Sequence, residues 1–153
     1  MGRVLTLVGG ALVLLLAGLA LAVYLSRDED NLAIDNLLAE RFSRAVALAP
    51  EGSKVDLGAV ANFPWDHVLI VARGTPDDAI SRRIGQPWTG IVGLQTGDLM
   101  LFERGGRVVR FADYRGEGRF AGIPRPFAEL PRRRAVFVVR NLVMRPAPNA
   151  TSR

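Results

Sequence analysis

The sequence contains no cysteine and only one histidine. Without cysteine, the chain cannot form a disulfide, a cysteine-based zinc site, an iron–sulfur cluster, a thiol nucleophile or a lipid-modified N-terminal cysteine. A single histidine, His67, excludes a multi-histidine metal site built from one chain. The sequence therefore predicts neither a metal nor a cofactor, and 153 residues give room for one domain.

Catalytic patterns are also missing. Asp66 and His67 are adjacent, and adjacent side chains on a strand point to opposite faces, so Asp66 would not orient the imidazole. No nucleophile-elbow pattern is present. The acids Asp113, Glu117 and Glu129 lie among arginines, which favour charged carboxylates over the protonated acid that glycosidase chemistry uses. We predict a protein that is not an enzyme, with a hydrolase site assembled by folding as the alternative.

A long uncharged run is the strongest feature that is present. Residues 4–25 carry no charged side chain, and a helix of that length spans ~33 Å, close to the ~30 Å hydrocarbon core of a bilayer. Arg3 precedes the run and acidic residues follow it at 28–30, so we expect a cytoplasmic N-terminus and an exported domain. The alternative is a cleavable signal peptide, because residues 20–22 (Ala-Leu-Ala) resemble a cleavage site.

Two helices are expected after this run. Residues 31–48 place apolar side chains at helical spacing. This helix either begins with Asp28 or Asp30 as the N-cap or continues directly from the predicted membrane helix. Residues 75–85 predict a shorter helix. Its expected signals are Thr75 as the N-cap, Pro76 at the first helical position, Asp78 in a capping box and Gly85 at the C-terminal end.

Strands are expected between and after these helices. Residues 66–72 contain four consecutive aliphatic residues, three of them β-branched, which predicts a strand covered on both faces. Residues 99–112 predict a hairpin about the pair Gly105-Gly106. Further strands are expected at 135–143 and, interrupted by glycine, at 88–95. In the simple hairpin register, the buried face would consist of Met100, Phe102, Val109 and Phe111, and Glu103 would lie diagonal to Arg110.

This order of elements predicts an α+β fold. It has one N-terminal transmembrane helix, followed by a small domain with a mainly antiparallel sheet and two helices on one face. We expect a transmembrane anchor over residues 1–26, an exported domain over 27–144, and a disordered tail over 145–153, where apolar periodicity is absent.

Positive charge is concentrated in the C-terminal third. Residues 26–98 hold seven basic and eleven acidic residues, whereas residues 99–153 hold twelve arginines and four acids. Guanidinium groups bind phosphate and carboxylate bidentately, so this region is a candidate surface for a partner or an anion. The alternative is a set of solvated loops and strand edges. The candidate arginines are Arg104, Arg107, Arg110, Arg115, Arg119, Arg125, Arg132, Arg133 and Arg134.

Two sets of aromatic residues are further candidates. Trp65 and Trp88 flank the short helix and would form either an aromatic platform for a ligand or part of the core. Phe120, Ile123 and Phe127 are spread through a loop rich in glycine and proline. They would form either an exposed docking patch or a small core beneath that loop.

One stretch carries a resemblance. Residues 63–68 read Phe-Pro-Trp-Asp-His-Val, and Thr75-Pro76, Ile80, Ile84-Gly85 and Trp88 follow. Over residues 62–112 this resembles small bacterial membrane-anchored or lipoprotein domains in which an aromatic-x-Trp-Asp segment enters a strand. The resemblance implies a fold and a location but no activity, and the chain departs from it in having no cysteine to lipidate.

Together these features predict a single-pass protein of the bacterial inner membrane with an extracytoplasmic (periplasmic) domain. We expect an accessory or assembly subunit that docks on a membrane protein complex through protein–protein contacts. The alternative is a module that binds anionic lipid or cell-wall polymer through its arginines. A nucleic-acid partner is not expected, because an exported domain without a recognised binding motif or interleaved aromatics does not suit one.

Overall fold

The computed structural model describes residues 33–90 and 97–148, which all belong to one compact unit, Leu32–Arg153. The predicted anchor, residues 1–26, lies outside the described residues. Within the described ranges, no helix is long and apolar enough to cross a membrane.

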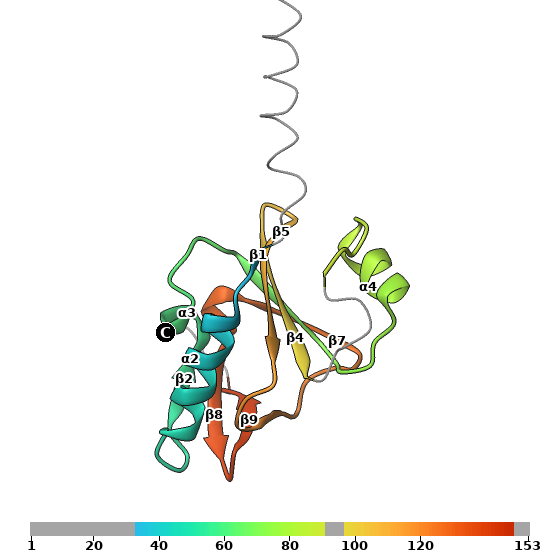
Figure 1. Ribbon diagram of the computed structural model, residues 1–153. Helices are drawn as coiled ribbons and strands as arrows, with labels where there is room; N and C mark the ends of the chain where they lie inside the picture. The colour runs from blue at the N-terminus through green and yellow to red at the C-terminus, as the bar shows by residue number, and fades with distance from the viewer. Residues whose placement is uncertain (1–32, 91–96, 149–153) are drawn as a thin grey trace, which may run out of the picture. The chain divides into compact units, whose positions relative to one another are not determined.

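The described chain folds into short strands and few helices (Figure 1). In chain order they are β1 (Ala33–Ile34), α2 (Asn36–Ala47), β2 (Lys54–Asp56), α3 (Leu57–Val60), β3 (His67–Val71), α4 (Asp77–Ile84), β4 (Asp98–Arg104), β5 (Arg107–Tyr114), β6 (Arg119–Phe120), β7 (Phe127–Pro131), the 3-10 helix η1 (Arg132–Arg134), β8 (Val136–Arg140) and β9 (Val143–Pro146).

The strands form two sheets instead of the single sheet expected. Sheet A has the order β1-β5-β4-β3-β7, and sheet B has the order β2-β8-β9-β6. The pairs β1–β5 and β6–β9 are parallel and the other pairs are antiparallel, so the predicted α+β class with a mainly antiparallel arrangement is confirmed. The second sheet was not predicted, because β2 and β6 have only three and two residues and are too short to show a strand pattern in the sequence.

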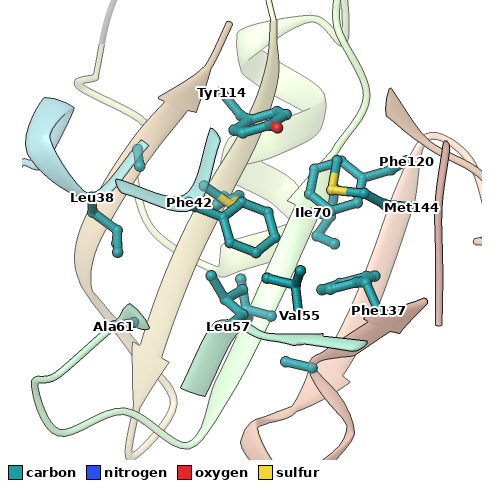
Figure 2. Close-up of a cluster of buried hydrophobic side chains, with 14 of the residues drawn as sticks. Leu38, Phe42, Val55, Leu57, Ala61, Ile70, Tyr114, Phe120, Phe137 and Met144 are labelled. Atoms are coloured by element: carbon teal, nitrogen blue, oxygen red, sulfur yellow. The ribbon is translucent and has the colours of Figure 1, made fainter. Parts of the chain in front are cut away.

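The main core lies between sheet A on one side and α2 with sheet B on the other (Figures 1 and 2). Phe42 of α2 is fully buried, and its ring lies 5.5 Å from that of Tyr114, 6.2 Å from Phe120 and 6.1 Å from Phe137. The rings therefore join α2, β5, β6 and β8 in one cluster.

A second, smaller core covers the opposite face of sheet A, where Ile80 of α4 and Trp88 pack. The two long helices thus lie on different faces of sheet A, and the expectation of helices on one face is wrong (Figure 1). Strand β3 is buried on both faces as predicted. Val68 and Ile70 belong to the main core, and Leu69 and Val71 belong to the smaller one.

Helix α2 begins five residues later than predicted. Its N-cap is Asp35, whose side chain accepts a hydrogen bond from the Leu38 amide at 2.8 Å. Asp28 and Asp30 therefore do not cap it. The preceding residues Ala33 and Ile34 pair with β5, and this extended backbone cannot also be the first turn of the helix.

Helix α4 keeps its predicted C-terminal end but not its predicted cap. Gly85 has a left-handed conformation with φ of 69° and closes the helix, as expected. The Thr75 hydroxyl instead donates to the Ala72 carbonyl at 2.6 Å, so Thr75 is not the N-cap and the capping box is absent. Pro76 occupies the N-cap position without a side-chain bond.

The β4–β5 hairpin turns at Gly105-Gly106 as predicted, and Arg104 faces Arg107. A β-bulge between Phe102 and Glu103 then shifts the register, so the predicted buried face is correct for Met100 and Phe102 and wrong for Val109 and Phe111. Phe102 pairs with Arg110 and Met100 with Ala112, and Val109 stays 39% exposed. Phe111 is buried on the other face, and Arg110 pairs with Asp35, which replaces the expected Glu103 partner.

The last strand continues past the expected end of the domain at residue 144. The predicted strand at 135–143 divides into β8 and part of β9, and β9 runs to Pro146. The Ala147 amide then donates to the Val136 carbonyl at 2.8 Å. Residues 145–147 therefore belong to the folded domain and not to a tail. Of the expected strand at 88–95, residues 88–90 are not extended into a sheet, and residues 91–95 lie outside the described ranges.

Candidate functional site

The register of sheet A separates the candidate arginines into two groups at opposite ends of the sheet. His67, the first residue of β3, pairs with Glu103 near the end of β4 and with Pro131 at the end of β7. These positions define the N-proximal end, which holds the arginines of the hairpin, of early β5 and of η1: Arg104, Arg107, Arg110, Arg132, Arg133 and Arg134.

The distal end lies where β4 begins and β5 ends, since Asp98 pairs with Tyr114. Arg115, Arg119 and Arg125 lie here, together with Arg73, which follows β3 and which the sequence patterns did not single out. The nine predicted arginines therefore do not form one patch.

Two of the six arginines at the N-proximal end are part of the fold. Arg110 pairs with Asp35 at 2.8 Å, and its guanidinium lies 4.2 Å from the centre of the Phe63 ring. Arg132 donates to the carbonyls of Phe63 at 2.9 Å and Gly58 at 3.1 Å, and it lies over the Trp65 ring at 5.1 Å. These contacts fix the loop before β3 against the end of the sheet.

The other four arginines at this end are exposed. Arg104 and Arg107 flank the hairpin turn, and Arg133 and Arg134 lie in η1. Among residues 33–90 and 97–148, none of the four has a carboxylate within ion-pair distance. The acid Asp66 lies at the same turn, where its carboxylate accepts the Gly105 amide at 2.8 Å. We name Arg104, Arg107, Arg133 and Arg134 the N-proximal arginines.

Glu103 is another acid at this end. Burial, with the nearby charge of Glu129, raises its pKa, while the positive charge of Arg83 and His67 opposes the shift. Arg83 itself pairs with Glu129. This end therefore carries exposed positive charge that the adjacent carboxylates neutralise only in part.

The chain enters the described domain at the same end. Ala33 pairs with Arg110, three residues from the hairpin turn, and the Asp35 amide donates to the Phe111 carbonyl at 2.8 Å. Helix α2 then runs beside β5 toward the distal end, where the Ser43 hydroxyl accepts the Glu117 amide at 2.7 Å.

Four arginines line a hollow of about 450 Å³ at the distal end, which we name the distal hollow. Arg125 binds Asp98 with both terminal nitrogens, at 3.0 and 3.3 Å. Arg115 binds Asp113 at 2.6 Å. Arg73 uses its backbone amide to reach Asp98 at 3.0 Å. Within the described chain, the guanidinium groups of Arg73 and Arg119 have no acidic partner.

Tyr114 lines the distal hollow, and its ring lies 5.5 Å from the Phe42 ring of α2. It is 4% exposed, and its hydroxyl donates to the Glu117 carbonyl. Burial raises its pKa to about 12 from the ordinary 10.0, a shift that a hydrogen bond with Ser43 partly opposes.

This shift predicts a loss of stability in strong alkali. The folded-state pKa of Tyr114 lies above the unfolded value, so its contribution is complete below pH 10 and disappears as pH rises toward 12. Over that window the unfolding free energy should fall by about 1.4 kcal/mol per pH unit. Ultraviolet absorbance should show a tyrosine ionising near pH 12. Tyr114→Phe should remove that transition, and a tyrosine ionising only near pH 10 would contradict the burial argument.

The aromatic candidates lie inside the domain. Trp65 is 3% exposed in the main core and Trp88 is 7% exposed in the smaller one, so they are buried in separate clusters and form no shared platform. Phe120 is 2% exposed in the main core. Ile123 and Phe127 are half-buried against the two cores, so these aromatic and aliphatic side chains follow the core alternative and not the docking patch.

The structure brings no catalytic constellation together around His67 in the described residues. His67 is half-buried opposite Glu103, while Ser43 accepts the Glu117 amide and Ser81 donates to the Asp77 carbonyl. No group of three or more metal-ligating side chains occurs in the described part of the chain.

Comparison with known proteins gives no match to any family model, any curated protein or any solved structure.

Proposed function

We propose that this chain is a non-enzymatic, single-pass membrane protein whose extracytoplasmic domain binds anionic lipid headgroups through the N-proximal arginines. One observation supports this most directly. The end of sheet A that carries four exposed arginines without acidic partners is also the end at which the chain enters the domain.

The length of the connecting segment strengthens the proposal. If residues 4–25 span the bilayer, residues 26–32 are the only link to Ala33. Seven residues reach at most about 25 Å even when fully extended. The N-proximal arginines would then lie within reach of the headgroup layer, where each basic side chain near an anionic surface contributes about 1 kcal/mol.

A second candidate is the accessory or assembly subunit that docks on a membrane protein complex. Its support is a different observation: Ile34 is 48% exposed, Leu37 is 62% exposed and Val109 is 39% exposed. These side chains lie at the start of the domain or on the strand beside β1. A partner protein in the same membrane could cover these apolar side chains by contacting the side of the domain, while the arginines face the lipid.

Purification of the full-length protein from its native membrane in mild detergent separates the two candidates. Native mass spectrometry should find anionic lipid retained on the wild-type protein. It should find less on a variant in which the four N-proximal arginines are glutamine. A stoichiometric protein companion that both versions retain, with no preference for anionic lipid, would favour the docking subunit instead.

A further inference from the structure

We propose that the distal hollow is a separate binding site for a phosphate-bearing ligand. The inference does not depend on the lipid-binding function proposed above, because the distal hollow lies at the opposite end of sheet A from the N-proximal arginines.

The lining of the hollow supports an anion. Four arginines line it, Arg73, Arg115, Arg119 and Arg125, and Asp98 is the one carboxylate among the described lining residues. Like charges gathered in one hollow repel one another, and a bound anion relieves that repulsion. The volume of about 450 Å³ falls in the range of small-molecule sites, so a complete phosphorylated group can enter.

Two of the guanidinium groups are held in position before a ligand arrives. The bidentate contact with Asp98 orients Arg125, and Arg125 also donates to the Phe120 carbonyl at 3.3 Å. The contact with Asp113 orients Arg115, and Asp113 is 5% exposed, so this anchor is fixed within the fold. Arg73 and Arg119 remain to form new charge-assisted hydrogen bonds.

Phosphate fits this arrangement better than carboxylate. A carboxylate has two oxygens and satisfies one guanidinium fork, as Asp98 already does for Arg125. A phosphate group offers at least one further acceptor and up to two negative charges, so it can bridge arginines that approach from different elements. Arg73 follows β3, Arg115 follows β5 and Arg119 begins β6, so the arginines that line the hollow come from three different parts of the fold.

The test uses the full-length protein in neutral detergent at fixed ionic strength, with inorganic pyrophosphate as the probe in isothermal titration calorimetry. Pyrophosphate should bind saturably at one site. The double variant Arg73→Gln/Arg119→Gln should bind it at least about tenfold more weakly, because two charge-assisted contacts are lost. The matched control Arg41→Gln/Arg140→Gln removes the same charge from two exposed arginines outside the hollow and should change affinity less than about twofold.

An opposite effect is expected from Asp98→Asn. This variant removes the one carboxylate in the described lining. It keeps Oδ1, which accepts both the Arg73 amide and the Arg125 guanidinium, so Arg125 stays in position and pyrophosphate should bind more tightly. A variant that merely disturbed the fold would not strengthen binding. The proposal is overturned by absent saturation, by equal weakening in the matched control, or by citrate binding as tightly as pyrophosphate.

Discussion

Replacing Arg104, Arg107, Arg133 and Arg134 with glutamine is expected to detach the domain from an anionic bilayer. At about 1 kcal/mol for each arginine, the four substitutions cost about 4 kcal/mol at low salt, which is roughly a thousandfold in the equilibrium between attached and detached domain. None of the four has an acidic partner among the described residues, so the fold should lose less than about 0.5 kcal/mol.

The measurement places the full-length protein in nanodiscs that contain phosphatidylglycerol and follows hydrogen exchange at the β4–β5 hairpin. Wild-type protein should show protection there that decreases as salt is added, because screening weakens surface electrostatics. A matched variant with glutamine at Arg73, Arg119, Arg140 and Arg145 should keep the protection. Protection that is the same in both variants would show that the hairpin arginines do not hold the domain.

Phe42→Ala is expected to be the most destabilising single substitution. The side chain is fully buried, and its ring contacts three other aromatic rings that come from β5, β6 and β8. Removing a buried phenylalanine costs about 3–5 kcal/mol, through lost transfer free energy and the cavity that remains. Domains of this size are commonly stable by about 5–15 kcal/mol, so the variant should be close to the folding threshold.

Urea denaturation followed by circular dichroism measures this loss. Leu37→Ala is the matched control, because Leu37 lies on the same helix and is 62% exposed, and it should change the unfolding free energy by less than about 0.5 kcal/mol. Phe42→Leu should recover part of the loss, since it keeps most of the apolar volume. Equal stability of Phe42→Ala and Leu37→Ala would contradict the assignment of the main core.

Short-range sequence patterns predicted the helices and strands better than they predicted which strands pair and in which register. The four aliphatic residues of β3 and the left-handed Gly85 at the end of α4 act within a few residues, so the sequence indicated both. The bulge between Phe102 and Glu103 changes the pairing of β4 with β5 by one residue, and no local sequence signal marks it. Asp35 became the cap of α2 only because Ala33 and Ile34 pair with β5, a partner far away in the chain.

The candidate site also depends on long-range pairing that the sequence does not show. Composition identified an arginine-rich region but could not divide it, because the division follows from the register of sheet A. Arg73 joins the distal hollow from a different part of the sequence, through the contact between its backbone and Asp98. The burial of Trp65, Trp88 and Phe120 likewise required knowing which of two cores, or of two sheets, would receive each ring.

The most direct test of the lipid-facing orientation uses the absence of cysteine, which allows a single label at a chosen position. Val109→Cys places a fluorophore on a 39% exposed side chain beside the N-proximal hairpin, and Leu48→Cys places one on a 77% exposed side chain after α2, toward the distal end. In nanodiscs with phosphatidylglycerol and a headgroup-attached quencher, our account predicts strong, salt-sensitive quenching at position 109 and weak quenching at position 48. Equal quenching at both positions, or stronger quenching at position 48, would contradict it.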